Sequence, residues 1–236
     1  MRVLVTRPAG DGEITSAALV AAGHVPIPAP VLAVRPVPAD LDPRDWRGIV
    51  ATSRHAVRAI FRRTDVEDWL GLPILCVGEA TATAARNAGF RTVVEGGGDV
   101  ATLVETMVPE NWPAPLLYPC GEVVSIDLPA ALAKRGVTVE RRVVYAADVL
   151  PTLSPEAEIA LLGRAVDGAV FYSPRSVKGF AAQVRTARLE ARLGGLTAWC
   201  MSDAIATAAK AAGFGHIRVA AEKTGESLIA TIAAPQ

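Results

Sequence analysis

The sequence lacks an excess of charge of either sign. Its 24 Lys and Arg residues balance 24 Asp and Glu residues, so the formal net charge at pH 7 is zero. A broad basic surface for nucleic acid is therefore not expected. A small anionic ligand is compatible with this balance, because backbone N–H groups at helix N-termini bind anions without net charge.

Cysteine and histidine are scarce, at three residues each. Every cysteine follows an apolar stretch, no CxxC or Cys/His ligand spacing occurs, and the histidines lie far apart in the sequence. This pattern predicts no metal site. It is typical of cysteines that serve as small buried residues in a reducing compartment.

Long apolar runs are absent as well. No run approaches the roughly 18 apolar residues of a membrane-spanning helix. The opening run, Met1 to Thr6, lacks the long apolar region of a signal peptide. We therefore expect a cytoplasmic protein without a membrane partner.

Motifs for several chemistries are also missing. The sequence contains no GxSxG, no Walker loop and no HExxH, and the glycines of Gly96–Gly98 do not form a GxGxxG fingerprint. These absences argue against an oxidoreductase or a kinase.

The sequence does contain short apolar runs that alternate with Ala- and Leu-rich segments. The runs suit strands buried on both faces, and they are Val3–Val5, Gly48–Ala51, Ile74–Val77, Leu116–Tyr118, Ala169–Tyr172 and Ala198–Met201. Four of the segments between them end at a glycine, which accepts the positive φ of a helix C-cap. These glycines are Gly23, Gly89, Gly136 and Gly213. The alternation predicts an α/β protein whose parallel sheets are covered by helices.

An internal repeat divides the chain into two similar halves. Glu79–Phe90 recurs as Asp203–Phe214, and Thr52–Arg58 recurs as Tyr172–Lys178. We interpret the repeat as two α/β domains of similar fold. The order of the repeated parts allows two consecutive domains, and it equally allows one domain inserted into a split one. An insertion requires two connectors, for which Pro26–Pro38 and Val143–Val149 are candidates.

The turns that follow the predicted strands are rich in Gly and in small hydroxyl residues. They are Thr6–Gly10, Thr52–His55, Gly78–Thr81, Pro119–Glu122, Ser173–Ser176 and Ser202–Asp203. In an open parallel sheet, ligands bind beyond the carboxyl ends of the strands. Helix capping explains any one of these residues. Together they also fit an anion-binding cleft between two domains, lined by helix N-termini.

Acid–base residues near these turns are few. Tyr145 lies in a candidate connector rather than in a strand–helix unit, from which it could extend over an interdomain cleft; alternatively it is a half-buried aromatic residue in a strand. Arg7 and Arg175 are candidates for pairing with substrate carboxylates or with acidic neighbours. His55 could titrate near neutral pH, or it could be a capping or surface residue.

The order and spacing of these motifs resemble the uroporphyrinogen-III synthase family over essentially the whole chain. The motifs that carry the resemblance are Leu4–Gly10, Thr52-Ser53, Val77–Ala82, Pro119–Glu122, Val143–Tyr145 and Ser173–Val177. The resemblance implies two similar flavodoxin-like parallel-sheet domains joined by a two-stranded linker. A discontinuous domain would comprise residues 1–30 and 150–236, the inserted domain residues 38–142, and the linker strands residues 31–37 and 143–149.

The resemblance also implies an activity. The family's reaction closes hydroxymethylbilane, a linear tetrapyrrole, into uroporphyrinogen III, with inversion of ring D and loss of water. This would make the chain a lyase without cofactor or metal. We also expect the protein to be a monomer. Tyr145 matches the tyrosine proposed to assist loss of the hydroxyl group, as a general acid. The residues expected to bind substrate are Arg7, Thr52, Ser53, Gly78, Thr81, Ala82, Gly121, Ser173, Arg175 and Ser202.

The chain departs from the family pattern at one turn. Where many members carry Gly and Thr, it has Ser202 and Ile205. This departure weakens the case for substrate binding by a threonine hydroxyl group at this turn, and Ser202 is the candidate for that contact.

Two other functions fit the same sequence features. One is a non-catalytic two-domain sensor of a small anionic ligand, since a fold does not fix a function. The other is an α/β enzyme acting on phosphorylated or nucleotide substrates, for which the expected Gly-rich phosphate loop is absent.

Overall fold

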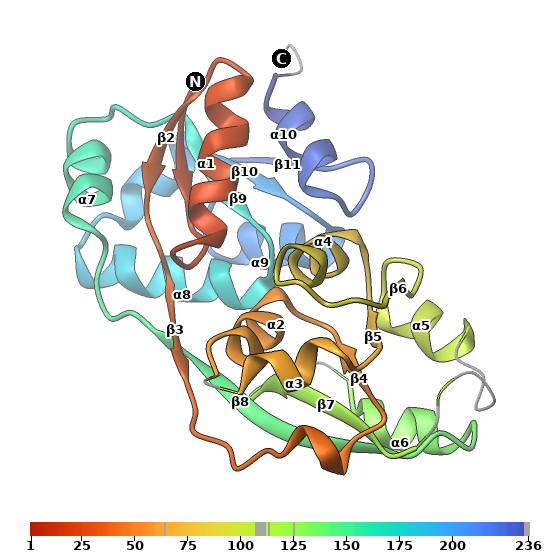
Figure 1. Cartoon of the computed structure of the whole chain (residues 1–236). Helices are drawn as coiled ribbons and strands as arrows, with labels where there is room; N and C mark the ends of the chain where they lie inside the picture. Colours follow the sequence, from red (N-terminus) through yellow and green to blue (C-terminus); the bar gives the residue numbers. More distant parts are fainter. Residues whose placement is uncertain (64, 107–111, 113, 125, 234–236) are drawn as a thin grey trace. The chain divides into compact units, whose positions relative to one another are not determined.

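The computed structural model describes residues 1–63, 65–106, 112, 114–124 and 126–233 (Figure 1). The chain forms two compact units. The discontinuous unit comprises Met1–Val34 and Asp148–Gln236, and the continuous unit comprises Arg35–Ala147. The chain passes from one unit to the other within strand β3 (Leu32–Pro36) and again within strand β8 (Val139–Val149).

The discontinuous unit contains a five-stranded sheet in the order β11-β10-β9-β1-β2, and all of its paired strands are parallel. Its strands are β1 (Arg2–Val5), β2 (Val25–Pro28), β9 (Gly168–Phe171), β10 (Thr197–Cys200) and β11 (His216–Val219). Its helices are α1 (Asp11–Ala21), α7 (Pro155–Leu162), α8 (Pro174–Thr186), the 3-10 helix η3 (Glu190–Gly195), α9 (Asp203–Ala211) and α10 (Gly225–Ala233).

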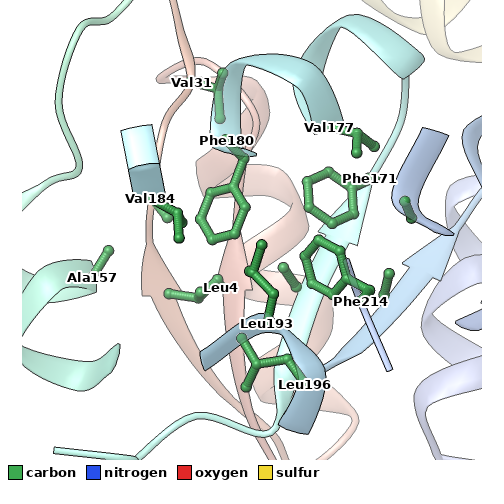
Figure 2. Close-up of a cluster of buried hydrophobic side chains, with 14 of the residues drawn as sticks. Leu4, Val31, Ala157, Phe171, Val177, Phe180, Val184, Leu193, Leu196 and Phe214 are labelled. Carbon is green, nitrogen blue, oxygen red and sulfur yellow. The ribbon is translucent and has the colours of Figure 1, made fainter. Parts of the chain in front are cut away.

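Helices cover both faces of this sheet, which explains why its central strands are apolar at successive positions. Successive side chains of a strand point to opposite faces. Leu4 packs in one cluster with side chains of α7, α8 and α9, while Val3 and Val5 pack in another with side chains of α1 and α10. Figure 2 shows the first cluster, in which the rings of Phe171 and Phe214 meet edge to face at 5.5 Å between centroids.

The continuous unit contains a six-stranded sheet in the order β3-β8-β7-β4-β5-β6. Its further strands are β4 (Gly48–Ala51), β5 (Ile74–Cys76), β6 (Val93–Glu95) and β7 (Leu116–Gly121). Its helices are the 3-10 helix η1 (Pro43–Asp45), α2 (Arg54–Phe61), α3 (Val66–Leu70), α4 (Glu79–Asn87), α5 (Val100–Thr106) and α6 (Leu128–Ala133). Ile49 of β4 packs in a cluster with side chains of α2, α3 and α4, whereas the next residue, Val50, packs with side chains of α5 and α6. Parallel sheets covered by helices, the architecture predicted from the sequence, are thus confirmed.

The two sheets have the same strand order with a different chain order. The repeated segments make β4 and β5 the equivalents of β9 and β10. The strand order then makes β7, the other neighbour of β4, the equivalent of β1, the other neighbour of β9. With these equivalences, β8-β7-β4-β5-β6 matches β2-β1-β9-β10-β11 strand for strand. The units are therefore related by a circular permutation, as an insertion into a split repeat would produce. Which boundaries separate functional domains stays a prediction.

The four predicted C-cap glycines all have positive φ, between 77° and 97°, so these helix ends are confirmed. Tyr145 matches the alternative of a half-buried aromatic residue in a strand. The segment Val143–Val149 continues β8, and within it Tyr145 pairs with Gly121 of β7. A continuous apolar segment does not reveal where a strand's pairing ends.

Candidate functional site

In each sheet, two neighbouring central strands send their connections to opposite faces. These strands are β1 and β9 in the discontinuous unit and β7 and β4 in the continuous unit. The crevice outside the carboxyl ends of such a pair is where open α/β sheets bind ligands. The turns at these two places are therefore the candidate ligand-binding site of each unit.

In the discontinuous unit, Arg7 follows β1 and is held from two sides. Its Nη2 donates to Oδ2 of Asp11 at 2.7 Å, and its Cζ lies 4.1 Å from the ring centroid of Tyr172. The side chain of Asp11 is only 7% exposed and that of Arg7 19%. This arrangement restricts the guanidinium group and leaves it other donors for an anion.

The same crevice is fixed by buried hydroxyl groups. Thr6 is fully buried, and its hydroxyl group donates to the carbonyl of Val170 at 2.7 Å, which ties β1 to β9. The hydroxyl group of Thr15, which also donates to the carbonyl of Asp11, lies 3.4 Å from that of Tyr172. Tyr172 is thus positioned by α1 as well as by Arg7.

The predicted serines at helix N-termini differ in what their hydroxyl groups do. Ser173 caps α8, since its Oγ accepts from the N–H of Ser176 at 3.1 Å and lies 2.8 Å from the hydroxyl group of Ser176. Arg175 lies in the first turn of α8. Ser202 occupies the cap position of α9 without a side-chain bond to that helix. Ser173 therefore stabilises its helix, while Ser202 leaves first-turn N–H groups of α9 without a side-chain acceptor from the cap.

The helix α4 is the repeat equivalent of α9, and it begins in a similar way. Its cap residue is Gly78, which has no side chain to offer. Thr81 and Ala82 are buried, and the N–H group of each donates to the carbonyl of Gly78 at 3.0 Å. The first-turn N–H groups of Glu79 and Ala80, which have no acceptor within a helix, are therefore the better anion donors at this turn. Substrate binding by Thr81 and Ala82 stays a prediction.

In the continuous unit, Thr52 and Ser53 follow β4. The hydroxyl group of Thr52 lies 3.2 Å from that of Tyr118 on β7. Burial raises the pKa of Tyr118, against the opposing effect of this hydrogen bond, so its phenol stays protonated at neutral pH. Ser53 caps α2 by accepting from the N–H of His55 at 3.1 Å.

Tyr145 lies at the carboxyl end of β7, close to these residues. The pairing of β7 with β8 passes from Cys120–Val143 to Gly121–Tyr145, so Val144 forms a bulge. Bulges redirect side chains and are frequent beside active sites. The ring of Tyr145 lies 5.5 Å from that of His55, measured between centroids, and against Gly121.

Sequence reasoning missed Arg141, which holds the turn after β7. Its Nε donates to Sγ of Cys120 at 3.2 Å, and its Nη2 donates to the carbonyl of Glu122 at 2.8 Å. It also missed Tyr118 and Asp11. The candidate residues come from the turns after the predicted strands, whereas Tyr118 lies within a strand and Asp11 within a helix. The spacing of Arg7 and Asp11, four residues apart, was the one available signal.

The structure thus places the predicted residues in two groups. Arg7 and Ser173 lie at the carboxyl ends of neighbouring strands, with Ser202 following the next strand, β10. The second group lies at the carboxyl ends of β4, β5 and β7 of the continuous unit and consists of Thr52, Ser53, Gly78, Thr81, Ala82 and Gly121, with Tyr145 of β8 paired with Gly121. Within the described ranges, no group of three or more His, Cys, Asp or Glu side chains could hold a metal ion. No helix in the described part of the chain is long and apolar enough to cross a membrane.

Comparison with known proteins places this chain among relatives. A family model described as uroporphyrinogen-III synthase HemD matches residues 13–230. The fold resembles the crystal structure of uroporphyrinogen-III synthetase from Helicobacter pylori, with a TM-score of 0.64 and 17% identity over 98% of this chain and 97% of that chain. It also resembles a mutant uroporphyrinogen III synthase from the extremely thermophilic bacterium Thermus thermophilus, with a TM-score of 0.55 and 21% identity over 98% of this chain and 97% of that chain. Because the family model spans most of its length, the chain belongs to the uroporphyrinogen-III synthase family.

Proposed function

We propose that this chain cyclises hydroxymethylbilane to uroporphyrinogen III, with inversion of ring D and loss of water. The observation that carries the proposal is the family match over residues 13–230. The crevices described above support it, since they offer hydroxyl groups, an arginine and helix N-termini to an anionic substrate. The enzyme is a lyase.

The substrate carboxylates are bound at the carboxyl ends of the strands. Arg7 offers guanidinium N–H groups, and the first turns of α4 and α9 offer backbone N–H groups that the cap residues do not occupy with a side chain. Ser173 and Arg175 contribute polar groups at the start of α8, and Thr52 and Ser53 do so at the start of α2. Several weak contacts of this kind hold a flexible chain of four pyrroles in a curled shape, and such positioning is a major source of rate enhancement.

Tyr145 is the general acid in the first step. As the C–O bond of the terminal hydroxymethyl group breaks, driven by the electron pair of its pyrrole nitrogen, the Tyr145 phenol protonates the departing oxygen, which leaves as water. The resulting azafulvene is attacked by the last ring at its substituted carbon, which gives a spiro intermediate. Fragmentation and recombination then invert ring D before closure, and the proton lost from the carbon skeleton restores the phenol.

We propose further that each unit is a flavodoxin-like domain and that β3 and β8 form a two-stranded linker between residues 1–30 plus 150–236 and residues 38–142. The matching strand orders and the passage of the chain within these two strands support this assignment. We also propose that the protein is a cytoplasmic monomer. Three free, buried thiols are compatible with a reducing compartment, and sedimentation tests the monomer.

An isomer assay tests the function. The chain is incubated with hydroxymethylbilane, and the oxidised ring products are separated by chromatography. The proposal requires an excess of the type III isomer over the type I isomer that forms spontaneously. A non-catalytic sensor would leave the type I isomer alone, and that outcome would refute the proposal.

A further inference from the structure

The discontinuous unit has a cavity at the amino ends of its strands. The turns described above lie at the opposite, carboxyl ends. The volume of the cavity is about 320 Å³. Val166 and Leu196, which line it, precede β9 and β10, so the cavity lies at the amino ends of these strands. Leu161 adds a further apolar wall, while Arg164 and Arg192 are its charged lining residues. Since open sheets bind their substrates beyond the carboxyl ends of their strands, this place is not the candidate active site.

Arg164 has an unusual backbone conformation for a non-glycine residue. It ends α7 with a φ of 53°, and the N–H of Ala165 donates to the carbonyl of Ala160 at 2.9 Å. Glycine is the usual residue at this position of such a helix end. Arg188 ends α8 in the same way, with a φ of 59°, but it is not among the residues that line the cavity. The two arginines therefore form a matched pair that differs in access to the cavity.

The charges around the cavity have one sign. No carboxylate among the described residues lines it, and none of the described ion pairs involves Arg164 or Arg192. An adjoining cavity of about 450 Å³ differs, because Asp167 lines it together with Arg218 and His216. Mixed charges there favour neither an anion nor a cation, whereas two arginines beside an apolar wall favour an organic anion.

We propose that the smaller cavity binds a small carboxylate with an apolar body, such as a one-ring aromatic acid. Guanidinium groups bind carboxylates through paired N–H donors, and apolar walls bury the rest of a ligand. The cavity is at the small end of ligand sites, which range from about 300 to 1,000 Å³. It therefore suits a single ring rather than a tetrapyrrole, and its ligand is distinct from the substrate.

Calorimetric titration of the full chain with phthalate tests the site. Arg164→Gly removes the charge and suits the positive φ, so this variant keeps its fold. Arg192→Gln removes the second charge, and Arg188→Gly is the matched control. We expect saturable binding to the parent chain, about tenfold weaker binding to Arg164→Gly and Arg192→Gln, and unchanged binding to Arg188→Gly.

Three results would overturn the proposal. They are the lack of saturable binding at millimolar phthalate, equal weakening by Arg188→Gly, and binding that neither cavity variant changes. Inorganic phosphate is titrated in parallel, and phosphate binding as tight as phthalate binding would overturn the role of the apolar wall. The isomer assay is expected to be unchanged in Arg164→Gly and Arg192→Gln, which separates this site from the proposed function.

Discussion

The ring of Tyr145 fills the space that a side chain on Gly121 would need. A Cβ atom on Gly121 would lie 2.8 Å from Cε2 and 3.1 Å from Oη of Tyr145. The two residues are paired across β7 and β8 next to the bulge, and the ring of His55 lies on α2 beside the tyrosine. The orientation of the phenol therefore depends on backbone geometry and on the absence of one methyl group.

Removing the phenol oxygen should slow the reaction without harming the fold. General acids contribute about 10²- to 10⁴-fold to rate. Because a pyrrole carbinol loses its hydroxyl group readily, we expect an effect at the lower end of this range. Tyr145→Phe should lower kcat about 100-fold. Product affinity and Tm should stay close to those of the parent chain. Turnover equal to that of the parent would remove Tyr145 from the mechanism.

Adding the missing methyl group at Gly121 should displace the ring. We expect Gly121→Ala to lower kcat about as much as Tyr145→Phe does, and the double variant to be little slower than Tyr145→Phe alone, because both changes act on one group. Gly71→Ala is the control, since the nearest atom to its Cβ would be the Asp68 carbonyl oxygen at 3.9 Å. Additive losses in the double variant would show that Gly121 acts independently of the tyrosine.

Much of the fold could be predicted from the sequence because its signals are local. Apolar runs, glycines with positive φ and serines before helices each depend on a few neighbouring residues, as at Gly89 and Ser53. The bulge at Val144 could not be predicted, because Val143–Val149 is a continuous run in which nothing marks an extra residue. The circular permutation could not be predicted either. The order of the repeats fits two consecutive domains as well as one domain inserted into a split one.

The site was predictable where it lies in turns and was missed where it lies in strands. Thr52 was expected at a turn, but its partner Tyr118 is a buried strand residue, 66 positions away, that only folding brings near. Arg141 resembles any charged residue of an exposed strand, and its bonds to Cys120 and Glu122 follow from the pairing of β8 with β7.

Arg7 should affect both substrate binding and stability. Arg7→Ala would remove the cation that lies 2.7 Å from the buried carboxylate of Asp11, and the loss of one partner of a buried ion pair is costly. We expect a rise in KM of about tenfold, as for a lost charged hydrogen bond, and a loss of about 1 kcal/mol or more of unfolding free energy. Arg7→Lys should keep part of the stability but not the planar contact with Tyr172.

The control is Arg44→Ala. Arg44 forms an exposed pair with Asp42, so its loss should leave KM and stability unchanged. An Arg7→Ala variant with parental KM would exclude Arg7 from substrate binding.

The buried thiols should make the protein less stable at alkaline pH. Burial raises the pKa of Cys76 and of Cys200 from 9.0 to about 12. A raised pKa in the folded state means that stability is fully present below pH 9 and is lost as the pH rises from 9 toward 12. Urea unfolding at several pH values should follow this trend, and Cys200→Ala should flatten it.

Thiol labelling tests the burial of these cysteines directly. At about pH 8, below the ordinary thiol pKa, a thiol reagent should modify them only after unfolding. Rapid labelling of the native protein would contradict their burial.

Gly179, in the middle of α8, should tolerate alanine only if Val31 becomes smaller. A Cβ on Gly179 would lie 2.3 Å from Cγ1 of Val31, which is fully buried and lies close to α8 in Figure 2. Alanine favours a helix interior by about 1 kcal/mol over glycine, but overpacking of a core costs about 1–3 kcal/mol. We therefore expect Gly179→Ala to lower the free energy of unfolding in the parent chain.

In a Val31→Ala background the clash disappears, so the same change should become neutral or stabilising. Measuring both by urea unfolding gives the sign in each background, and the same sign in both would show that Val31 is not what requires glycine here.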